Sequence, residues 1–282
     1  MSHTIVVVPC YNEAQRLDVA EFQRFVHENP THRFLFVDDG STDATWDVLE
    51  QLRRAEPEGV STCRLPVNSG KAEAVRQGMR RALADGAEYA GFWDADLATP
   101  LDTVLTFSAL LDSRPDVAMV FGARVSLLGR CVERKAVRHY LGRLFATAAS
   151  LTLGVGIYDT QCGAKLFRAS PEIAALFEQP FQSRWIFDVE ILARLIAARR
   201  GTNLMPVERI IYEYPLHAWR DVAGSKVKPS DFLKALAGLA AIRRNYRIRK
   251  PWPRRLPAIG TTHNRPEVGV HARTAKGGVH QR

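Results

Sequence analysis

The sequence predicts an α/β protein with a mostly parallel, doubly wound sheet that carries helices on both faces. Two observations lead to this prediction. Short apolar runs alternate with helix-like segments over residues 4–122, and three of these runs end in polar motifs. In sheets of this kind, ligands bind at the carboxyl ends of the strands. We therefore expect the chemistry in the loops that follow Val8, Val37 and Trp93.

The elements of the first half alternate regularly. The apolar runs typical of buried parallel strands are Thr4–Val8, Phe34–Val37, Tyr89–Trp93 and Val117–Phe121. The helix-like segments lie near 14–28, 43–55, 70–85 and 102–113. Ser41, Thr42 and Asp43 provide an N-terminal cap for the second of these helices.

The second half is less regular. In chain order we expect a basic loop and helix over 124–153, a short strand at 163–168, a helix at about 187–200, a β-rich stretch over 203–213 and an apolar helix at 231–246. Beyond about Lys250 the chain is rich in Pro, Gly, His and Arg without periodicity, which predicts disorder. We therefore expect one domain over 1–247 and a basic, disordered tail over 248–282.

Charge is distributed unevenly along the 282 residues. The formal net charge is +9, but residues 1–242 contain 28 basic and 29 acidic residues, whereas 243–282 contain 11 basic residues and one acid. A basic protein can bind nucleic acid or an anionic membrane. The basic end has only Tyr246 and Trp252 as aromatic residues and contains no recognisable module, so specific nucleic-acid binding is not expected.

Membrane and redox signals are sparse. The longest uncharged stretch, Leu144 to Tyr158, has 15 residues, fewer than the roughly 20 that a spanning helix needs. No signal-peptide pattern is present, and four scattered cysteines without a CxxC pair favour a reducing compartment. We expect a cytoplasmic protein without a transmembrane segment, attached peripherally to an anionic membrane through the 231–246 helix and the tail. A helix packed on the domain body is the alternative for 231–246.

Acidic side chains follow three of the predicted strands. They are Glu13, Asp38, Asp39, Asp94 and Asp96. Like charges at one sheet edge repel and raise one another's pKa, so their convergence favours a divalent cation. Carboxylate oxygens suit Mg²⁺ or Mn²⁺, which usually also bind substrate phosphates. Each carboxylate taken singly could equally cap the next helix.

Other phosphate-binding patterns are missing. The sequence has no GxGxxG, and Gly70-Lys71-Ala72 lacks the earlier Gly and the Ser/Thr of a P-loop. Lys71 at a helix start can still meet an anion. Its alternative is a solvated surface lysine.

Three motifs stand at the strand ends in order: Pro9-Cys10-Tyr11-Asn12-Glu13, Asp38-Asp39-Gly40-Ser41-Thr42-Asp43 and Asp94-Ala95-Asp96. In this order and placement they resemble family 2 glycosyltransferases of the GT-A fold, which use nucleotide-diphospho-sugars. Further along, 158–167, 184–190 and Gly224-Ser225-Lys226 resemble the dolichyl/polyprenyl-phosphate β-glucosyltransferase branch. The resemblance covers roughly residues 3–247.

On the donor side, the resemblance implies a UDP-sugar and a metal ion. The nucleotide-sugar-binding residues would be Pro9, Tyr11, Asn12, Glu13, Asp38, Asp39, Lys71, Asp94 and Gln161. Asp94 and Asp96 would hold Mg²⁺ or Mn²⁺, with Asp96 the direct ligand and a catalytic residue. The metal would neutralise charge that develops on the departing UDP.

On the acceptor side, the stretch from Arg124 to Arg143 contains six basic residues and one acid. The resemblance implies that Arg124, Arg134 and Arg138 bind an acceptor phosphate, with Arg124 also acting in catalysis. Lys226 is a further anion-binding candidate. Arginine suits this task because its planar fork matches phosphate oxygens. The alternative is a solvated basic helix face.

Asp188 and Glu190 are the remaining catalytic candidates. In a helix, an i,i+2 pair points to different faces, so only one should reach the reaction centre, and we favour Asp188. Relatives that glycosylate hydroxyl groups use an acid here as general base. A phosphate monoester needs less help because its second pKa is about 6. We therefore expect a positioning or electrostatic role, with a structural helix-start carboxylate as the alternative.

Taken together, the resemblance implies a metal-dependent, inverting enzyme of protein glycosylation that moves glucose from UDP-glucose to a polyprenyl phosphate and gives a β-linked product. Ala98 stands where mannose synthases of the sister branch have Gln. The alternatives are another nucleotide sugar such as GDP-mannose, a hydroxyl acceptor or, outside enzymes, nucleic-acid binding through the tail.

Overall fold

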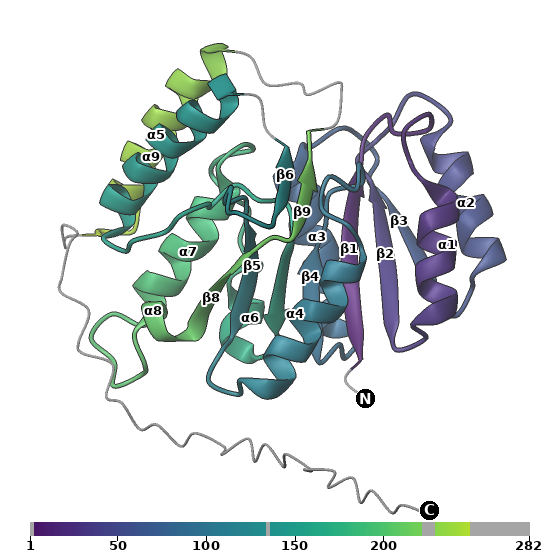
Figure 1. Cartoon of the computed structure of the whole chain (residues 1–282), viewed down its shortest axis with the longest axis horizontal. Helices are drawn as coiled ribbons and strands as arrows, with labels where there is room; N and C mark the ends of the chain where they lie inside the picture. Colours follow the sequence, from purple (N-terminus) through teal and green to yellow (C-terminus); the bar gives the residue numbers. More distant parts are fainter. Residues whose placement is uncertain (1–2, 134–135, 222–228, 249–282) are drawn as a thin grey trace, which may run out of the picture.

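The computed structural model of the chain describes residues 3–133, 136–221 and 229–248. In these residues a seven-stranded sheet of order β3-β2-β1-β4-β7-β5-β8 forms the centre, and a second ribbon pairs β6 with β9 (Figure 1). The strands are β1 Thr4–Cys10, β2 His32–Asp38, β3 Val60–Arg64, β4 Tyr89–Phe92, β5 Met119–Ala123, β6 Cys131–Glu133, β7 Lys165–Arg168, β8 Ile211–Pro215 and β9 Ala218–Arg220.

Strand β7 is the one reversed strand in the described part of the large sheet. The pairs β1–β2, β1–β4, β2–β3 and β5–β8 are parallel, whereas β7 runs antiparallel to both β4 and β5. Lys165, the first residue of β7, therefore pairs with Phe92 and Phe121 near the carboxyl ends of β4 and β5. The reversed strand thus enters the sheet at the edge where we expect the chemistry.

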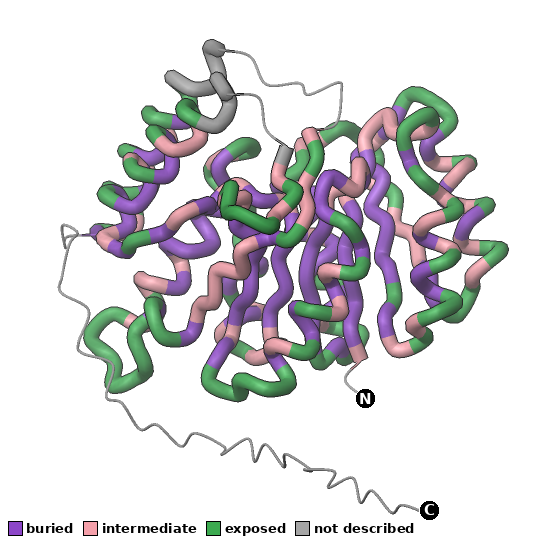
Figure 2. The backbone as a smooth tube through the Cα atoms, viewed as in Figure 1, coloured by how far each residue is buried: buried purple, intermediate pink, exposed green. Residues whose placement is uncertain are grey.

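Helices cover both faces of this sheet (Figure 1). In the described residues they are α1 Val19–Glu28, α2 Thr45–Ala55, α3 Lys71–Ala84, α4 Asp102–Ser113, α5 Ala136–Leu153, α6 Pro171–Ala175, α7 Phe187–Ala198, α8 Val207–Ile210 and α9 Pro229–Asn245. One hydrophobic cluster joins α3, α5, α7 and α9 to the sheet, and the other joins α1, α2 and α4 to the opposite face. Figure 2 shows the strands buried between these two layers. The doubly wound α/β prediction is confirmed.

Side-chain alternation along the strands explains the two layers. In β1, Val6 and Val8 belong to the cluster with α1 and α4, whereas Ile5 and Val7 belong to the cluster with α3. Almost all residues of β1 are buried, as expected for a parallel strand covered on both faces. The continuous apolar run in the sequence follows from this double burial.

Several element boundaries differ from the sequence-based expectation. Helix α1 begins at Val19 rather than near 14, because residues 14–16 form a turn and the Asp18 carboxylate caps the helix by accepting from Glu21 N. In the stretch 203–213, which we expected to be β-rich, α8 precedes β8. Strands β3, β6 and β9 and helix α6 were not predicted. β3 is partly exposed and polar, so it lacks the apolar run of a buried strand.

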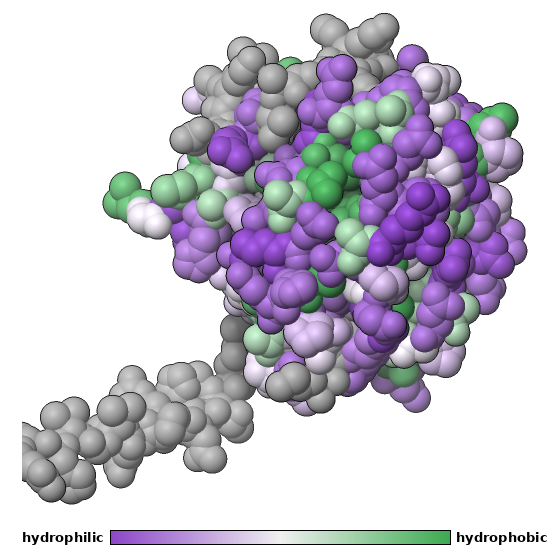
Figure 3. Space-filling view, turned by 90° about the vertical axis from the view of Figure 1, so that its right-hand side faces the viewer, coloured by the Kyte–Doolittle hydropathy of each residue, from purple (hydrophilic) through white to green (hydrophobic). Residues whose placement is uncertain are grey.

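Helices α5 and α9 lie side by side at one end of the molecule (Figure 1). Helix α9 packs its small and branched residues inward, with Ala235, Leu239 and Ile242 buried. The apolar side chains exposed on α5 share one side of that helix; they are Tyr140, Leu141, Leu144 and Leu151. The face turned toward the viewer in Figure 3, on the side of α1 and α2, is mostly hydrophilic around one hydrophobic patch near its centre. Among the described residues no helix is both long and apolar enough to span a bilayer.

Candidate active site

The first two motif loops are joined by side-chain hydrogen bonds. Asn12 Oδ1 accepts from Thr42 N at 2.9 Å, Ser41 Oγ accepts from Asn12 N at 3.0 Å, and Thr45 Oγ1 accepts from Glu13 N at 2.8 Å. Gly40 has a φ of +64°, and a Cβ there would meet the backbone of Val67 and Asn68 at 2.6 Å. Asn12 thus acts within the protein as a connector between the carboxyl ends of β1 and β2. Pro9 and Tyr11 are partly buried beside it.

The carboxylates of these loops have different partners. Asp39 accepts from Ser69 N at 2.7 Å and from Gly70 N at 2.8 Å, while burial raises its pKa. Asp38 Oδ1 accepts from Ser41 N, and Arg64 Nε lies 3.2 Å from Asp38 Oδ2. Within the described residues, Asp38 Oδ2 and Glu13 Oε2 are buried acceptors that receive no hydrogen bond. They could accept from a ligand.

Lys71 and Asp94 form an ion pair that links the start of α3 to the loop after β4. Burial alone would raise the pKa of Asp94, but the Lys71 ammonium group, with Lys165 and Arg124 nearby, holds this pKa below its usual value. Asp96 accepts from Ala98 N at 3.1 Å, and burial together with the Asp94 charge raises its pKa. Leu97, between Asp96 and Ala98, has a φ of +50°. The loop therefore concentrates negative charge at the sheet edge.

Asp94 and Asp96 are the carboxylates that could hold a divalent cation. Among the described residues no group of three or more His, Cys, Asp or Glu side chains is arranged to bind a metal. Two carboxylates fit a hard cation that completes its coordination with substrate phosphate oxygens and water. They do not fit a cation held by protein ligands alone.

The reversed strand β7 and the loop before it complete the site. A Cβ on Gly163 would lie 1.9 Å from Asp94 Oδ2, so the Asp94 carboxylate packs directly on this glycine. Lys165 Nζ lies 2.6 Å from Asp188 Oδ1, and both side chains are almost fully buried. Burial raises the pKa of Asp188, although Lys165 and Lys71 oppose this shift. Asp188 is therefore brought into the same charged cluster as Asp94.

Arg124 is held by Asp159. Its Nε and Nη2 donate to the two carboxylate oxygens at 2.6 and 2.8 Å, and its guanidinium lies 5.3 Å from the Trp219 ring centre. Burial would lower the pKa of Arg124, but Asp159 raises it above its usual value. Arg124 thus lies at the sheet edge with its charge already partly neutralised.

A small cavity of about 30 Å³ lies beside this pair, between the loop after β5, helix α5 and residues 158–161. Arg124, Arg143, Thr160 and Gln161 are among its lining residues. Thr160 Oγ1 and Gln161 Nε2 are buried atoms without a hydrogen-bond partner in the described part of the chain. The cavity therefore combines two cationic side chains with unused donors.

The remaining predicted residues are Glu190, Arg134, Arg138 and Lys226. Glu190 is fully buried and binds Arg194 and Tyr246 on the side of α7 away from Lys165. Arg138 belongs to α5, but its side chain is outside the described set, and Arg134 and Lys226 lie outside the described residues altogether. A wider cavity of about 470 Å³ lies between α2 and the edge strand β3, and it contains none of the predicted residues.

Three residues of the site were not singled out from the sequence: Arg143, Asp159 and Lys165. Arg143 stacks on Tyr158 at 3.7 Å from the ring centre and donates to Tyr158 O. A lysine at the start of a strand gives no signal of burial, and only the reversal of β7 brings Lys165 to Asp188. Glu213 holds the 158–159 backbone by accepting from Tyr158 N and Asp159 N.

Comparisons with known proteins identify the family. Residues 5–173 match the family "Glycosyl transferase family 2". The chain is 32% identical over 253 residues to dolichyl-phosphate beta-glucosyltransferase ALG5C of Trichomonas vaginalis, covering 85% of this chain and 70% of that protein.

Solved structures share the fold. Glucosyl-3-phosphoglycerate synthase of Mycobacterium tuberculosis in complex with UDP has a TM-score of 0.58 at 20% identity, covering 86% of this chain and 80% of the other. A mannosyltransferase of Pyrobaculum calidifontis in complex with GDP-Man and Mn²⁺ has a TM-score of 0.51 at 17% identity, covering 86% and 70%. The chain therefore belongs to glycosyltransferase family 2, and it is a glycosyltransferase of the GT-A fold.

Proposed function

We propose that this protein is a metal-dependent, inverting glucosyltransferase that moves glucose from UDP-glucose to a polyprenyl phosphate. The observation that carries the proposal is the contact between Asp94 and Gly163, which joins the carboxylate loop after β4 to the loop that holds Arg124. An anionic donor and an anionic acceptor would thus meet cationic side chains at one edge of the sheet. Similarity to dolichyl-phosphate beta-glucosyltransferases over 85% of the chain supports the glucose and the lipid phosphate.

The donor side follows from two buried carboxylate oxygens that receive no hydrogen bond within the described residues. Glu13 Oε2 and Asp38 Oδ2 would accept from the N–H and hydroxyl groups of a uridine, because charged acceptors form strong hydrogen bonds. Asp94 and Asp96 would hold Mg²⁺ or Mn²⁺, which supplies positive charge to the oxygens of the departing UDP. The Mn²⁺-containing mannosyltransferase of the same fold supports a cation here. Lys71 would turn from Asp94 toward the donor diphosphate.

The reaction itself needs little proton transfer. An oxygen of the acceptor phosphate forms a bond to the anomeric carbon, and the bond from that carbon to the UDP oxygen breaks on the opposite face, its electron pair leaving with UDP. The acceptor is largely a dianion at neutral pH. Arg124 and Arg143, with Thr160, would orient it, and Arg134, Arg138 and Lys226 stay candidates for the same role. Gln161, expected on the donor side, lines the same cavity and would contact the acceptor instead. Asp188, paired with Lys165, would act through its fixed charge.

Contact with the membrane would come from α5. We expect the exposed Tyr140, Leu141, Leu144 and Leu151 to enter the interface of a cytoplasmic membrane face while the protein stays peripheral. Arg243 and Arg244 at the end of α9 are exposed and would contact anionic headgroups. The basic tail would add to this attraction.

A product assay tests the proposal. The protein is incubated with undecaprenyl phosphate, Mg²⁺ or Mn²⁺ and, in separate reactions, labelled UDP-glucose, UDP-N-acetylglucosamine or GDP-mannose, and the organic extract is examined for a labelled glycolipid. We expect a glucolipid from UDP-glucose. A product from GDP-mannose alone, or no glycolipid at all, would contradict the proposal. Deleting 251–282 should leave transfer to detergent-solubilised acceptor unchanged, which would separate the tail from the chemistry.

The alternative with a hydroxyl acceptor predicts a different effect of substituting Asp188. It needs a general base, so Asp188→Asn would remove the acidic limb of the pH–rate profile, where the rate rises as the base loses its proton, and would lower kcat by about 10²- to 10⁴-fold. For a phosphate acceptor we expect a smaller loss with an unchanged pH profile between pH 6.5 and 8.

A further inference from the structure

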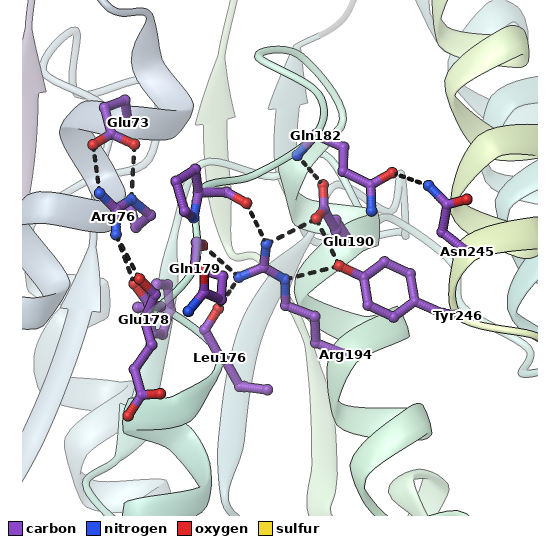
Figure 4. Close-up of polar contacts among 12 residues, drawn as sticks. Glu73, Arg76, Leu176, Glu178, Gln179, Gln182, Glu190, Arg194, Asn245 and Tyr246 are labelled. Atoms are coloured by element: carbon purple, nitrogen blue, oxygen red, sulfur yellow. Dashed lines mark hydrogen bonds and ion pairs between the residues drawn. The ribbon is translucent and has the colours of Figure 1, made fainter.

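Glu190 is the centre of a buried polar cluster, which we call the Glu190 clamp and which consists of Glu190, Arg194 and Tyr246 (Figure 4). Glu190 Oε1 accepts from Arg194 Nη2 at 2.9 Å and from Tyr246 Oη at 2.8 Å. Tyr246 Oη in turn accepts from Arg194 Nε at 3.1 Å. The clamp therefore joins α7 to the residue that follows α9.

The clamp holds the segment 176–186, which connects α6 to α7, by its backbone. Arg194 donates to the carbonyl oxygens of Leu176, Gln179 and Pro180 at 2.7 Å each. Glu190 Oε2 accepts from Gln182 N at 2.8 Å, and Asn245 Nδ2 donates to Gln182 Oε1 at 2.6 Å. From the other side, Arg76 of α3 donates to the Glu178 carbonyl at 2.8 Å. Figure 4 shows these two arginines flanking the segment.

The far end of the segment lies at the proposed donor site. The Arg184 side chain lies against Gly70, where an added Cβ would come within 3.2 Å of Arg184 Cδ. Gly70 N donates to Asp39, and the Arg184 charge partly opposes the burial that raises the pKa of Asp39. Arg184 is exposed, and its guanidinium forms no hydrogen bond or ion pair within the described residues. It is a cationic group next to Asp39 that is free to bind an anion.

We propose that the Glu190 clamp is a positioning device: it fixes the segment 176–186 so that Arg184 binds phosphate oxygens beside Gly70. This inference rests on the proposed function, which places a UDP-sugar diphosphate and a lipid phosphate at this edge. Glu190, Arg194 and Tyr246 act through Arg184 and touch no substrate.

The physical reason is preorganisation. An irregular segment that binds an anion must otherwise lose conformational entropy when the ligand arrives. Here the entropy is lost during folding, because the guanidinium groups of Arg76 and Arg194 bind five of the carbonyl groups of the segment. Ile186, at its end, packs on Gly238 of α9, where an added Cβ would lie 2.8 Å from Ile186 Cδ1. The segment is thus held between α3, α7 and α9.

The test reads ligand affinity and segment position separately. UDP and farnesyl phosphate are titrated calorimetrically, and the ¹⁹F NMR signal of Trp185, assigned with Trp185→Phe, is followed in 5-fluorotryptophan-labelled protein. We expect Arg184→Ala to weaken UDP binding about 10- to 100-fold, and Tyr246→Phe to weaken it by a smaller factor while shifting or broadening the Trp185 signal. In the Arg184→Ala background, Tyr246→Phe should change the affinity less than twofold.

Two variants serve as matched controls. Tyr89→Phe removes a tyrosine hydroxyl that also binds a carboxylate, Asp112, and an arginine, Arg168, but at the opposite end of β4. Arg33→Ala removes an exposed arginine at the start of β2. Both should leave the Trp185 signal and UDP affinity unchanged.

The outcomes separate this inference from the proposed function. If Arg184→Ala affects farnesyl phosphate rather than UDP, the arginine serves the acceptor phosphate and the proposal stands. If it affects neither ligand, or if Tyr246→Phe leaves the Trp185 signal and both affinities as in the wild type, the proposal is wrong. If the wild type binds no UDP, the assignment of UDP as donor is wrong. The proposal for the Glu190 clamp is then tested by the Trp185 signal and by the affinity for farnesyl phosphate.

Discussion

Lys165 Nζ and Asp188 Oδ1 lie 2.6 Å apart in a pair whose side chains are only 1% and 8% exposed. The pair joins β7 to α7 beneath the charged site. Because each charge is buried, removal of one partner leaves the other without compensation.

We expect Asp188→Leu and Lys165→Met each to lower the free energy of unfolding by about 3–5 kcal/mol. The double variant Lys165→Met/Asp188→Leu should recover most of that loss, because it leaves no unpaired charge, yet its transferase activity should stay below that of the wild type, because the fixed charge of Asp188 is missing. Urea unfolding of the wild type, both single variants and the double variant measures the coupling. Additive single effects would show that the pair is not an energetic unit.

Gly163→Ala should displace the Asp94 carboxylate, since the new Cβ would lie 1.9 Å from Oδ2. A displacement of about 1 Å in a reacting site can cost about 100-fold in rate, and we expect a loss of that size in kcat/KM with the fold retained. Gly86→Ala is the control: Gly86 has a φ of +80° but open space around it, so its substitution should affect stability alone. Equal activities of the two variants would refute the packing argument.

Chelation with EDTA should abolish transfer, and added Mg²⁺ or Mn²⁺ should restore it, because the two proposed carboxylate ligands would bind a cation only together with substrate. Asp96→Asn should lower activity by at least about 100-fold without changing the melting temperature by more than a few degrees. Activity at each metal concentration is the measurement. Full activity in EDTA would exclude a metal role.

Leu141→Gln/Leu144→Gln should reduce flotation with anionic liposomes, because both leucines lie on the exposed apolar side of α5. Leu204→Gln changes an equally exposed leucine in the loop before α8 and should float like the wild type. If the α5 double variant floats unchanged, α5 is not the membrane-contacting element.

The stability of the wild type relative to Glu213→Gln should fall as pH rises from 4 to 7. Burial raises the pKa of Glu213 in the folded state, so the unfolded chain releases this proton at a lower pH than the folded protein does. Ionisation between these two pKa values therefore destabilises the fold, and glutamine does not titrate. Urea unfolding of both proteins at pH 4 and 7 measures the effect. A stability difference that does not vary with pH would contradict it.

The sequence predicted those parts of the site that depend on strand ends. Apolar runs identify β1, β2, β4 and β5, and the loops after β1, β2 and β4 follow directly from them. The antiparallel direction of β7 was not predictable, because the residues of a four-residue strand do not indicate whether it pairs parallel or antiparallel. The consequences of that reversal, such as the Lys165–Asp188 pair, were therefore missed.

Ion pairs between residues far apart in the chain could not be predicted from the sequence either. Arg124 and Asp159 are 35 residues apart, and nothing in their spacing indicates a bidentate pair. Asp188 and Glu190 were expected on different faces of one helix, and α7 does place them with different partners, Lys165 and Arg194. The partner of each carboxylate depends on how α6, α7 and α9 pack, and the sequence does not show these tertiary contacts.

The reversed strand has a consequence for how this enzyme can diverge. The chain enters β7 at the reacting edge and leaves it at the opposite edge, where Arg168 binds the Tyr89 hydroxyl. An insertion or deletion between Asp159 and Lys165 would reshape the acceptor loop without altering the register of β7 against β4 and β5. A one-residue shift inside the strand would instead turn Lys165 away from Asp188. A change of loop length would therefore act on the contacts of Asp159 and Gly163, whereas a change of strand register would act on the Lys165–Asp188 pair.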